Sequence, residues 1–367
     1  MLHLVPGETG GSELYARRLV PALLDARQDL RLIVLAGEAA LPSLTVEEWA
    51  GEVELVGLPF DPRHRARRVL AEQTLLPRAA RKRGVDLLHN LFTTAPGAPL
   101  VPQVTTILDV IYKRFPETHA GLLGRGLAAL TWTAARRSRR ILTISEAAKA
   151  DIVRFLGVPA DNVDVTYPGP ALPQTAPADA RAELGLGPVP IVLTVSAKRP
   201  HKNLERLFEA FAQVRAEPAP ILVVPGYETF HEDELRKRAD EIGIADRIRF
   251  AGWVADDVLE GLYREAACLV FPSLAEGFGL PVLDALVRGT PVACSNASSL
   301  PEVAGDAALY FEPTDTDAIA AAIERLLADE ALRERLRAAG LSQAAKFSWA
   351  RTAEGTIESY DRALATR

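Results

Sequence analysis

The sequence of 367 residues contains few cysteines, few lysines and no long apolar run. Its two cysteines, Cys268 and Cys294, are too few for a disulfide framework and too far apart for a CxxC motif. This usage is typical of a cytoplasmic protein with incidental thiols. No stretch approaches the ~18–20 apolar residues of a membrane span, and the first residues lack the basic-then-apolar pattern of a signal peptide. The absence of a G-x-G-x-x-G segment argues against a dinucleotide-dependent dehydrogenase.

The net charge of −6 conceals an uneven distribution along the chain. Residues 1–170 carry 21 basic and 18 acidic side chains, a net of +3, and the remainder carries 21 and 30, a net of −9. Basic clusters lie at Arg63 to Arg68, Arg78 to Arg83 and Arg136 to Arg140. They are typical either of solvated helix faces or of a surface that meets an anionic partner, such as a membrane or a lipid phosphate. Nucleic acid is not expected, because no basic stretch is interleaved with aromatic residues.

Short apolar runs alternate with longer segments of helical periodicity throughout the chain. Alternation of strands and helices predicts an α/β fold, in which helices cover both faces of a parallel sheet. The expected helices include 12–26, 66–82, 122–137, 203–216, 232–241, 258–265, 280–288 and 316–328. The expected strands are 2–5, 30–35, 86–89, 104–108, 141–144, 163–165, 191–195, 219–224, 248–250, 268–271, 291–294 and 308–311.

The segment 167–190 contains six prolines, which cannot continue a central strand or helix. We therefore expect two doubly wound domains, residues 1–168 and 190–348, joined by a proline-rich linker at 169–189. In such sheets ligands bind beyond the carboxyl ends of the strands, so the cleft between the domains is the expected site.

Two of the candidate site segments follow a strand and open a helix. The loop beginning at Gly7 contains Gly10 and Gly11, which allow close approach of the backbone to a ligand; a tight turn capped by Ser12 is the alternative. The other is 195–203, where Lys198, Arg199, His201 and Lys202 gather although the chain has only seven lysines against thirty-five arginines. Cations at a helix N-terminus are unfavourable unless an anion joins them, so a phosphate is the expected ligand.

Two further segments follow later strands. In 271–286, Glu276 stands in a glycine-containing loop, and seven residues separate it from Asp284. A carboxylate in such a loop can accept hydrogen bonds from two sugar hydroxyls, although one acid beside a helix start also fits a purely structural role. The small polar loop 295–303 is typical either of a polar ligand site or of ordinary caps and turns.

Three of these segments, in this order, resemble glycosyltransferase family 4, the retaining, nucleotide-sugar-dependent GT-B group. The resemblance covers nearly the whole chain and implies two Rossmann-like domains facing across a cleft, with the final helix 349–367 packed back on the first domain. The matching segments are Lys202-Asn203, Glu276-Gly277-Phe278-Gly279-Leu280-Pro281 with Asp284, and Ser298-Ser299-Leu300-Pro301-Glu302; weaker matches are Gly10-Gly11, Thr143-Ile144-Ser145-Glu146 with Lys149, and Phe347-Ser348-Trp349.

The resemblance implies a role for each matching residue. Lys202 would neutralise the donor diphosphate, Glu276 would hold hydroxyls of the donor sugar, and Asp284 would hold the ribose. Lys202, Glu276 and Asp109 form the expected catalytic set, and no metal is implied. The other expected donor contacts are Gly10, Gly11, Ser196, Lys198, Arg199, Gly277, Phe278, Gly279, Leu280, Ser299 and Glu302.

The chain departs from the family pattern at three positions. Asp284 replaces the usual glutamate and is shorter by one methylene, and Ala197 stands where an arginine is common, so that Lys198 or Arg199 would supply the charge. Leu108 replaces a histidine placed near the reacting sugar, so either Asp109 or another group serves instead, or activity is reduced.

The activity implied is transfer of a hexose, with retention, from a nucleotide sugar to a hydroxyl of a glycan or lipid-linked acceptor. The run 298–303 looks most like mannosyltransferases of surface polysaccharide synthesis, which favours GDP-mannose over UDP-glucose. No cofactor beyond the nucleotide-sugar co-substrate is implied. A cytoplasmic enzyme is expected, at the inner face of the membrane if the basic half binds lipid. The alternatives are UDP-glucose or another UDP-sugar as the donor, or a sugar-nucleotide-binding protein with little catalysis.

Overall fold

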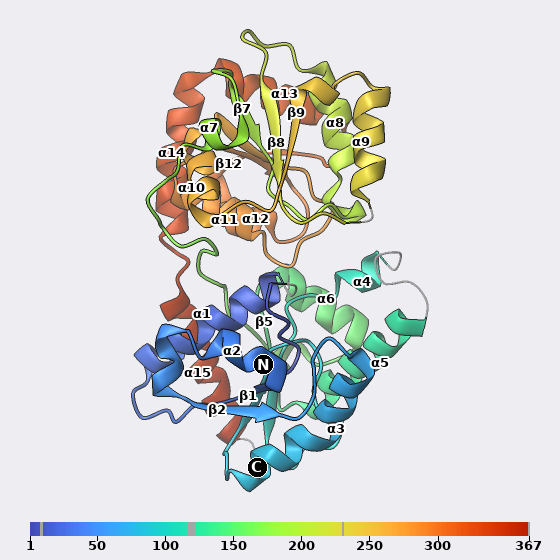
Figure 1. The fold of residues 1–367 in the computed structure, drawn as a ribbon, viewed down its shortest axis with the longest axis vertical. Coiled ribbons are helices and arrows are strands. Elements are labelled where there is room, and N and C mark those ends of the chain that lie inside the picture. Colours follow the sequence, from blue (N-terminus) through green and yellow to red (C-terminus); the bar gives the residue numbers. More distant parts are fainter. Residues whose placement is uncertain (8–9, 116–121, 230, 366–367) are drawn as a thin grey trace. The chain divides into compact units, whose positions relative to one another are not determined.

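The computed structural model describes residues 1–7, 10–115, 122–229 and 231–365 (Figure 1). The chain divides into two compact units. The first contains Met1–Gly169 together with Ser348–Arg367, and the second contains Pro170–Phe347. Each unit has a parallel sheet with helices packed on it, which is the α/β architecture expected from the alternating pattern.

The first unit contains two parallel sheets, in the orders β1-β2 and β3-β4-β5-β6. Its strands are short; helices lie between most of them, whereas the non-helical segment 91–102 connects the parallel pair β3 and β4. The strand β2 and the helix α6 were not among the expected elements. The strands are β1 (Ile33–Gly37), β2 (Glu54–Leu58), β3 (Leu88–Asn90), β4 (Gln103–Thr106), β5 (Arg140–Thr143) and β6 (Val163–Val165). The helices are α1 (Gly11–Ala26), α2 (Leu41–Leu44), α3 (Arg65–Lys82), α4 (Ile111–Arg114), α5 (Leu122–Arg137), α6 (Glu146–Leu156) and α15 (Trp349–Ala365).

The expected strand at 2–5 is wrong, because these residues form no strand. Leu2 and Leu4 are buried, but the amide of Leu4 donates to the carbonyl of Met1 in a turn. The amino group of Met1 is also buried, donates to the carbonyl of Leu35 in β1, and has its pKa lowered to about 5 by that burial. A cavity of about 460 Å³ is lined by residues of β1 and β3, which belong to the two separate sheets of this unit.

The final helix α15 belongs to the first unit and packs against α1. Trp349 meets the ring of Tyr15 edge-on, with centroids 5.7 Å apart, and a Cβ on Gly169 would lie 2.6 Å from the same tryptophan. Thr352 donates from Oγ1 to the carbonyl of Tyr167 at 2.7 Å. These contacts explain why the 348–367 segment joins the first unit although it follows the second in sequence.

The second unit has one parallel sheet in the order β12-β11-β10-β7-β8-β9. The strand order reverses between β10 and β7, so the carboxyl ends of these two strands mark the switch point where ligands of doubly wound sheets bind. Its strands are β7 (Ile191–Leu193), β8 (Ile221–Pro225), β9 (Ile248–Gly252), β10 (Cys268–Phe271), β11 (Val292–Ser295) and β12 (Ala308–Phe311).

Three sets of helices pack together in this unit: α8 with α9 and α13, α7 with α10, and α11 with α12 and α14 (Figure 1). Buried side chains of the first set, of α14 and of the sheet form one apolar cluster. The helices are α7 (Ala180–Leu184), α8 (Leu204–Gln213), α9 (Glu232–Glu241), α10 (Asp256–Glu265), α11 (Leu280–Val287), α12 (Leu300–Ala304), α13 (Thr316–Ala328) and α14 (Glu330–Ala344).

The proline-rich segment 170–189 is part of the second unit. It includes α7, whose N-cap Asp179 accepts a hydrogen bond from the amide of Ala182. This helix packs on α10, where a Cβ at Gly261 would lie 2.4 Å from the carbonyl oxygen of Ala178. The prolines therefore exclude a long helix or a central strand here, but the segment still packs on the second unit.

Candidate active site

Lys202 and Glu276, the two residues with the strongest expected roles, meet at the switch point. Lys202 belongs to the single helical turn η5 (Pro200–Lys202) beyond β7, and Glu276 lies in the loop beyond β10. Lys202 Nζ donates to both carboxylate oxygens of Glu276, at 2.7 and 2.9 Å. Both side chains are largely buried, with exposures of 17% and 9%. A buried cation and anion thus face each other where the fold places a ligand.

The backbone before α8 is held in an unusual conformation that directs Lys202. Asn203 has φ 60°, in the left-handed region, which asparagine tolerates better than most residues. Its Nδ2 donates to the carbonyls of Pro272, at 3.1 Å, and Pro313, at 2.7 Å. Asn203 therefore connects the start of α8 to the loop that carries Glu276. In the Lys-Asn pair, the asparagine fixes the backbone and the lysine contacts Glu276.

The Glu276 loop is held from its other side by the serine loop before α12. Ser299 donates to the carbonyls of Glu276 and Phe278, at 3.1 and 2.7 Å, and Ser298 donates to the carbonyl of Glu276 at 2.7 Å. Gly279 has φ 112° at the start of α11, and a Cβ there would lie 2.6 Å from a methyl carbon of Leu300. A glycine is therefore required at this position, both for its backbone and for space.

Three buried hydroxyl groups follow β7 and β10, the same two strands that precede Lys202 and Glu276. Thr194 and Ser196 follow β7, and Ser273 follows β10. Their hydroxyl oxygens are buried and have no hydrogen-bond partner among the residues that the structure describes. Because buried hydroxyls normally find a partner, these groups indicate a place for a ligand or for water.

The two other expected cations beyond β7 differ sharply. Lys198 is fully buried; its Nζ donates to the carbonyl of Gly226 and lies 3.5 Å from Glu232. Burial lowers the pKa of Lys198, although Glu232 opposes this shift. Arg199, by contrast, is exposed. Lys198 therefore holds the β7 and β8 loops together in this conformation, whereas Lys202 is bonded to Glu276.

Asp284 is buried in α11, but its carboxylate is occupied by backbone. Its Oδ1 accepts hydrogen bonds from the amides of Ala171, at 2.9 Å, and Leu172, at 3.2 Å. Burial raises the pKa of Asp284 to about 7, against the lowering effects of Arg288 and the two amides. The shorter side chain thus anchors the proline-rich segment, which sequence reasoning could not foresee because the contact spans more than one hundred residues.

The remaining expected donor contacts of this unit lie in the Glu276 loop, at the start of α11 and in α12. Phe278 is buried and meets the ring of Phe347 edge-on at 5.6 Å. Gly277 is buried beside it, Leu280 begins α11, and Glu302 lies half-buried in α12. The amide of Glu302 donates to the carbonyl of Ser299. The structure therefore brings the Glu276 loop and the serine loop together. The turn that carries Lys202, between β7 and α8, is bonded to the Glu276 loop.

Of the expected residues of the first unit, Gly10 and Gly11 lie at the start of α1 and Asp109 lies after the end of β4. Gly10 has φ 55° and caps α1, and a Cβ on Gly10 or Gly11 would meet no atom within 4 Å. Glu8 and Thr9, within the same predicted loop, lie outside the described residues. Asp109 follows β4 and its Oδ1 accepts the amide of Ile111 at 3.0 Å. Leu108, which stands where the family pattern has a histidine, offers no polar side-chain group.

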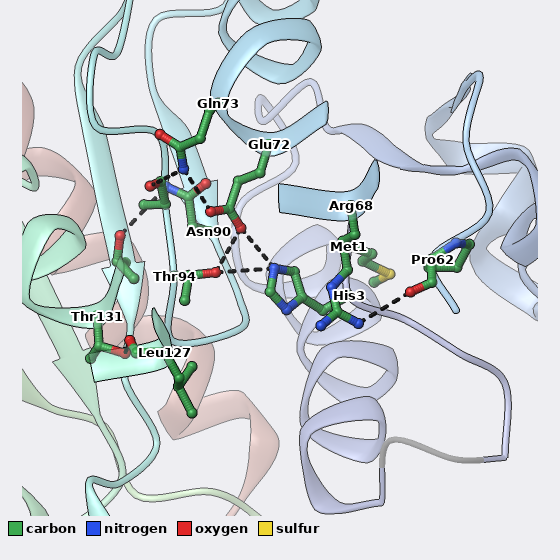
Figure 2. Close-up of polar contacts among 12 residues, drawn as sticks. Met1, His3, Pro62, Arg68, Glu72, Gln73, Asn90, Thr94, Leu127 and Thr131 are labelled. Carbon is green, nitrogen blue, oxygen red and sulfur yellow. Dashed lines mark hydrogen bonds and ion pairs between the residues drawn. The ribbon is translucent and has the colours of Figure 1, made fainter. Parts of the chain in front are cut away.

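A polar cluster in the first unit escaped the sequence reasoning (Figure 2). Glu72 of α3 is only 2% exposed, and its Oε2 contacts His3 Nε2 at 2.7 Å and accepts from Thr94 Oγ1 at 2.6 Å. Gln73 Nε2 donates to the other oxygen at 3.0 Å. The available signal is that Glu72 is the only acidic residue of α3 and falls among buried apolar positions.

Metal-ligating side chains come together at one place among the described residues: Glu205, His231 and Glu234. The ring nitrogens of His231 face different carboxylates, Nδ1 with Glu234 at 2.6 Å and Nε2 with Glu205 at 3.4 Å. Imidazole–carboxylate pairing accounts for this cluster. The sequence also contains one Asp-x-Asp triplet beginning at Asp315, but this aspartate accepts the amide of Ala318 as the N-cap of α13.

Two family models divide the chain between them. "Glycosyltransferase Family 4" matches residues 9–170, and "Glycosyl transferases group 1" matches residues 178–343. Both matched regions carry the doubly wound, Rossmann-like architecture described above, which defines the GT-B class of glycosyltransferases. The chain belongs to glycosyltransferase family 4 and is a glycosyltransferase.

Individual relatives agree with this assignment. The chain is 35% identical over 265 residues to the Escherichia coli O-antigen chain mannosyltransferase B, a match that covers 70% of this chain and 69% of the relative. It is 33% identical over 239 residues to the E. coli serotype-specific mannosyltransferase WbdA, covering 62% of this chain but only 29% of that protein. The fold is shared with Anabaena HepE in complex with UDP and glucose, with a TM-score of 0.76, 19% identity and 97% coverage of each chain.

Proposed function

We propose that the protein transfers a hexose, with retention, from a nucleotide sugar to a hydroxyl of a glycan or lipid-linked acceptor in polysaccharide or glycoconjugate synthesis. GDP-mannose is the donor we favour, because the names of the two bacterial relatives given above are those of mannosyltransferases. The observation that carries the proposal is the bidentate Lys202–Glu276 contact at the switch point of the second unit.

The proposed chemistry uses the two charges separately. The difficult part of glycosyl transfer is the negative charge that develops on the departing diphosphate, and a fixed ammonium aimed at it lowers the barrier without reorganisation. Lys202 supplies this charge, so no metal is required in the proposal. Glu276 holds Lys202 in the free protein and accepts hydrogen bonds from hydroxyls of the bound sugar. Asp109 of the first unit is the proposed catalytic group on the acceptor side.

The other proposed donor contacts follow from the loops around this pair. Backbone amides of the Glu276 loop would face the sugar and diphosphate, as loops at helix N-termini do. Asp284 would reach the ribose only with the oxygen that does not anchor the proline-rich segment. The proposed donor contacts besides the catalytic pair are Gly10, Gly11, Ser196, Lys198, Arg199, Gly277, Phe278, Gly279, Leu280, Asp284, Ser299 and Glu302.

Nucleotide binding is tested by thermal unfolding with GDP, GDP-mannose, UDP, UDP-glucose and ADP, each measured with EDTA present. A ligand at one hundred times its dissociation constant should add ~2.7 kcal/mol to the free energy of unfolding, and we expect this for the GDP compounds. Transfer of radiolabelled mannose with retained anomeric configuration, assayed by product NMR, completes the test. Absence of stabilisation by every nucleotide contradicts the proposal.

Two alternatives are separated by the same measurements. Stabilisation by UDP-glucose rather than GDP-mannose would assign a UDP-sugar donor, and HepE, which shares only the fold, was crystallised with UDP and glucose. Tight nucleotide binding without transfer or donor hydrolysis would favour a sugar-nucleotide-binding protein with little catalysis, a reading that Leu108 supports because it cannot hydrogen-bond.

Peripheral membrane association is a further part of the proposal and rests on α3. The described residues contain no helix long and apolar enough to cross a bilayer. The only acidic residue of α3, Glu72, is buried, whereas Arg65, Arg67, Arg78, Arg81 and Lys82 are exposed. Such a uniformly basic helix face is suited to anionic lipid headgroups.

We expect the protein to sediment with vesicles rich in phosphatidylglycerol, and to be released when salt is raised from 0.1 to ~0.5 M, because screening weakens surface attraction. The double variant Arg78→Glu/Arg81→Glu should lose this binding. Arg325→Glu/Arg335→Glu, on exposed positions of α13 and α14, is the matched control with the same change in net charge. Equal binding by both variants would remove α3 from the proposal.

A further inference from the structure

An aromatic pair stands at the carboxyl edge of the second unit's sheet. Tyr227 follows β8 and Trp253 follows β9, and their rings stack with centroids 4.5 Å apart at an angle of 28°. Trp253 is nevertheless 67% exposed. The other exposed tryptophan, Trp132 of α5, has the guanidinium of Arg136 over its ring at 3.9 Å. An indole that is stacked from one neighbour and still exposed is a surface prepared for a second flat ring.

Hydrogen bonds and close packing connect this pair to the Lys202 loop. Gly226, next to Tyr227, donates to the carbonyl of Gly252, next to Trp253, at 2.7 Å. A Cβ on Gly226 would lie 2.2 Å from the carbonyl oxygen of Ser196, so the β8 loop is packed directly on the β7 loop. Lys198 bonds to the carbonyl of Gly226 from the same β7 loop.

These contacts place three strand-end loops together, with the cation that would hold a diphosphate on the first and the aromatic rings on the second and third. A nucleotide sugar carries one aromatic group, the base, and ribose tethers it to the diphosphate. An aromatic side chain binds any base through its face, and the two-ring purines offer more stacking area than uracil. A sugar ring also packs on indole, but the donor sugar lies at the other end of the diphosphate.

We propose that Trp253, supported by Tyr227, is the platform on which the donor's nucleobase stacks and that it favours a purine. The inference rests on the proposed function, since it presumes that Lys202 marks the diphosphate. It adds residues outside every motif that identified the family, and it predicts that the base contributes to donor selection through ring stacking.

The test is nucleotide affinity by titration calorimetry on the full chain, with GDP and UDP as probes. Trp253→Ala should weaken GDP binding about tenfold, the order expected for loss of one base–aromatic stack, and should weaken UDP binding less. Trp253→Phe should keep most of the affinity for GDP because it retains an aromatic face. Trp132→Ala, the matched exposed tryptophan in the first unit, should bind GDP as the wild type does.

Fluorescence supplies a readout that a structural role would not affect. A base stacked on Trp253 should quench part of the emission of the four tryptophans, and the quenching should vanish in Trp253→Phe but persist in Trp132→Ala. Unaltered GDP affinity and quenching in the Trp253 variants would overturn the inference and leave the proposed function intact. A raised acceptor KM with unaltered GDP affinity would overturn it in favour of a glycan platform. Failure of the wild type to bind any nucleotide would overturn both proposals together.

Discussion

Replacing Lys202 by methionine is expected to lower the rate of glycosyl transfer at least ~100-fold, the scale observed when one preorganised charge stabiliser is removed. Methionine keeps the length and most of the volume of lysine but carries no charge. The effect should fall mainly on kcat, because in the proposed function the ammonium interacts most strongly with the charge that develops on the diphosphate in the transition state. Glu276→Gln should have a loss of similar size, because its carboxylate holds Lys202 and, in the proposed function, also accepts hydrogen bonds from the sugar.

The two side chains form one hydrogen-bonded unit, so their effects should not add. The double variant Lys202→Met/Glu276→Gln is expected to be little worse than either single variant. Lys237→Met removes an exposed lysine in α9 of the same unit and is the control, expected to retain wild-type kcat. Unfolding must be measured in parallel, since breaking a buried pair also destabilises the fold. Near-normal transfer by folded Lys202→Met would refute the assignment.

Replacing Arg288 by methionine is expected to lower the free energy of unfolding by ~3–5 kcal/mol, the usual cost of removing one partner from a buried ion pair. Arg288 is 1% exposed and donates to Glu260, itself fully buried, at 2.6 Å. It also donates to the carbonyls of Leu172 and Pro173, at 3.2 and 3.3 Å. The arginine therefore stabilises both the buried carboxylate and the proline-rich segment.

Arg264 provides a closely matched control, because it contacts the same Glu260 at 2.6 Å but is 52% exposed. Arg264→Met should cost at most ~1 kcal/mol, as exposed ion pairs do. Urea unfolding at neutral pH measures both variants, and unequal midpoints with equal slopes would support the comparison. If the two variants lose the same stability, burial of the Arg288–Glu260 pair is not what holds this region together.

Local sequence patterns were sufficient for most of the fold. The alternation of apolar runs with amphipathic segments predicts parallel α/β sheets, since buried parallel strands and their covering helices leave a strong local pattern. The positions of β7, β8 and β9 along the chain could be predicted from local apolar runs alone. The strand expected at 2–5 failed because an apolar run shows burial but not pairing: Leu2 and Leu4 are buried in a turn.

The chain by itself determined its family, its α/β class and the two residues that define the candidate site. Lys202 and Glu276 could be identified because glycine, helix-start and charge patterns are local and chemically specific. Only the tertiary structure decided that Lys198 is buried against Glu232, that Asp284 anchors the segment at 171–172, and that Trp253 stacks on Tyr227. Each of these depends on contacts between segments distant in sequence, and the energy of burying a charge or exposing an indole has no signature in the residues on either side.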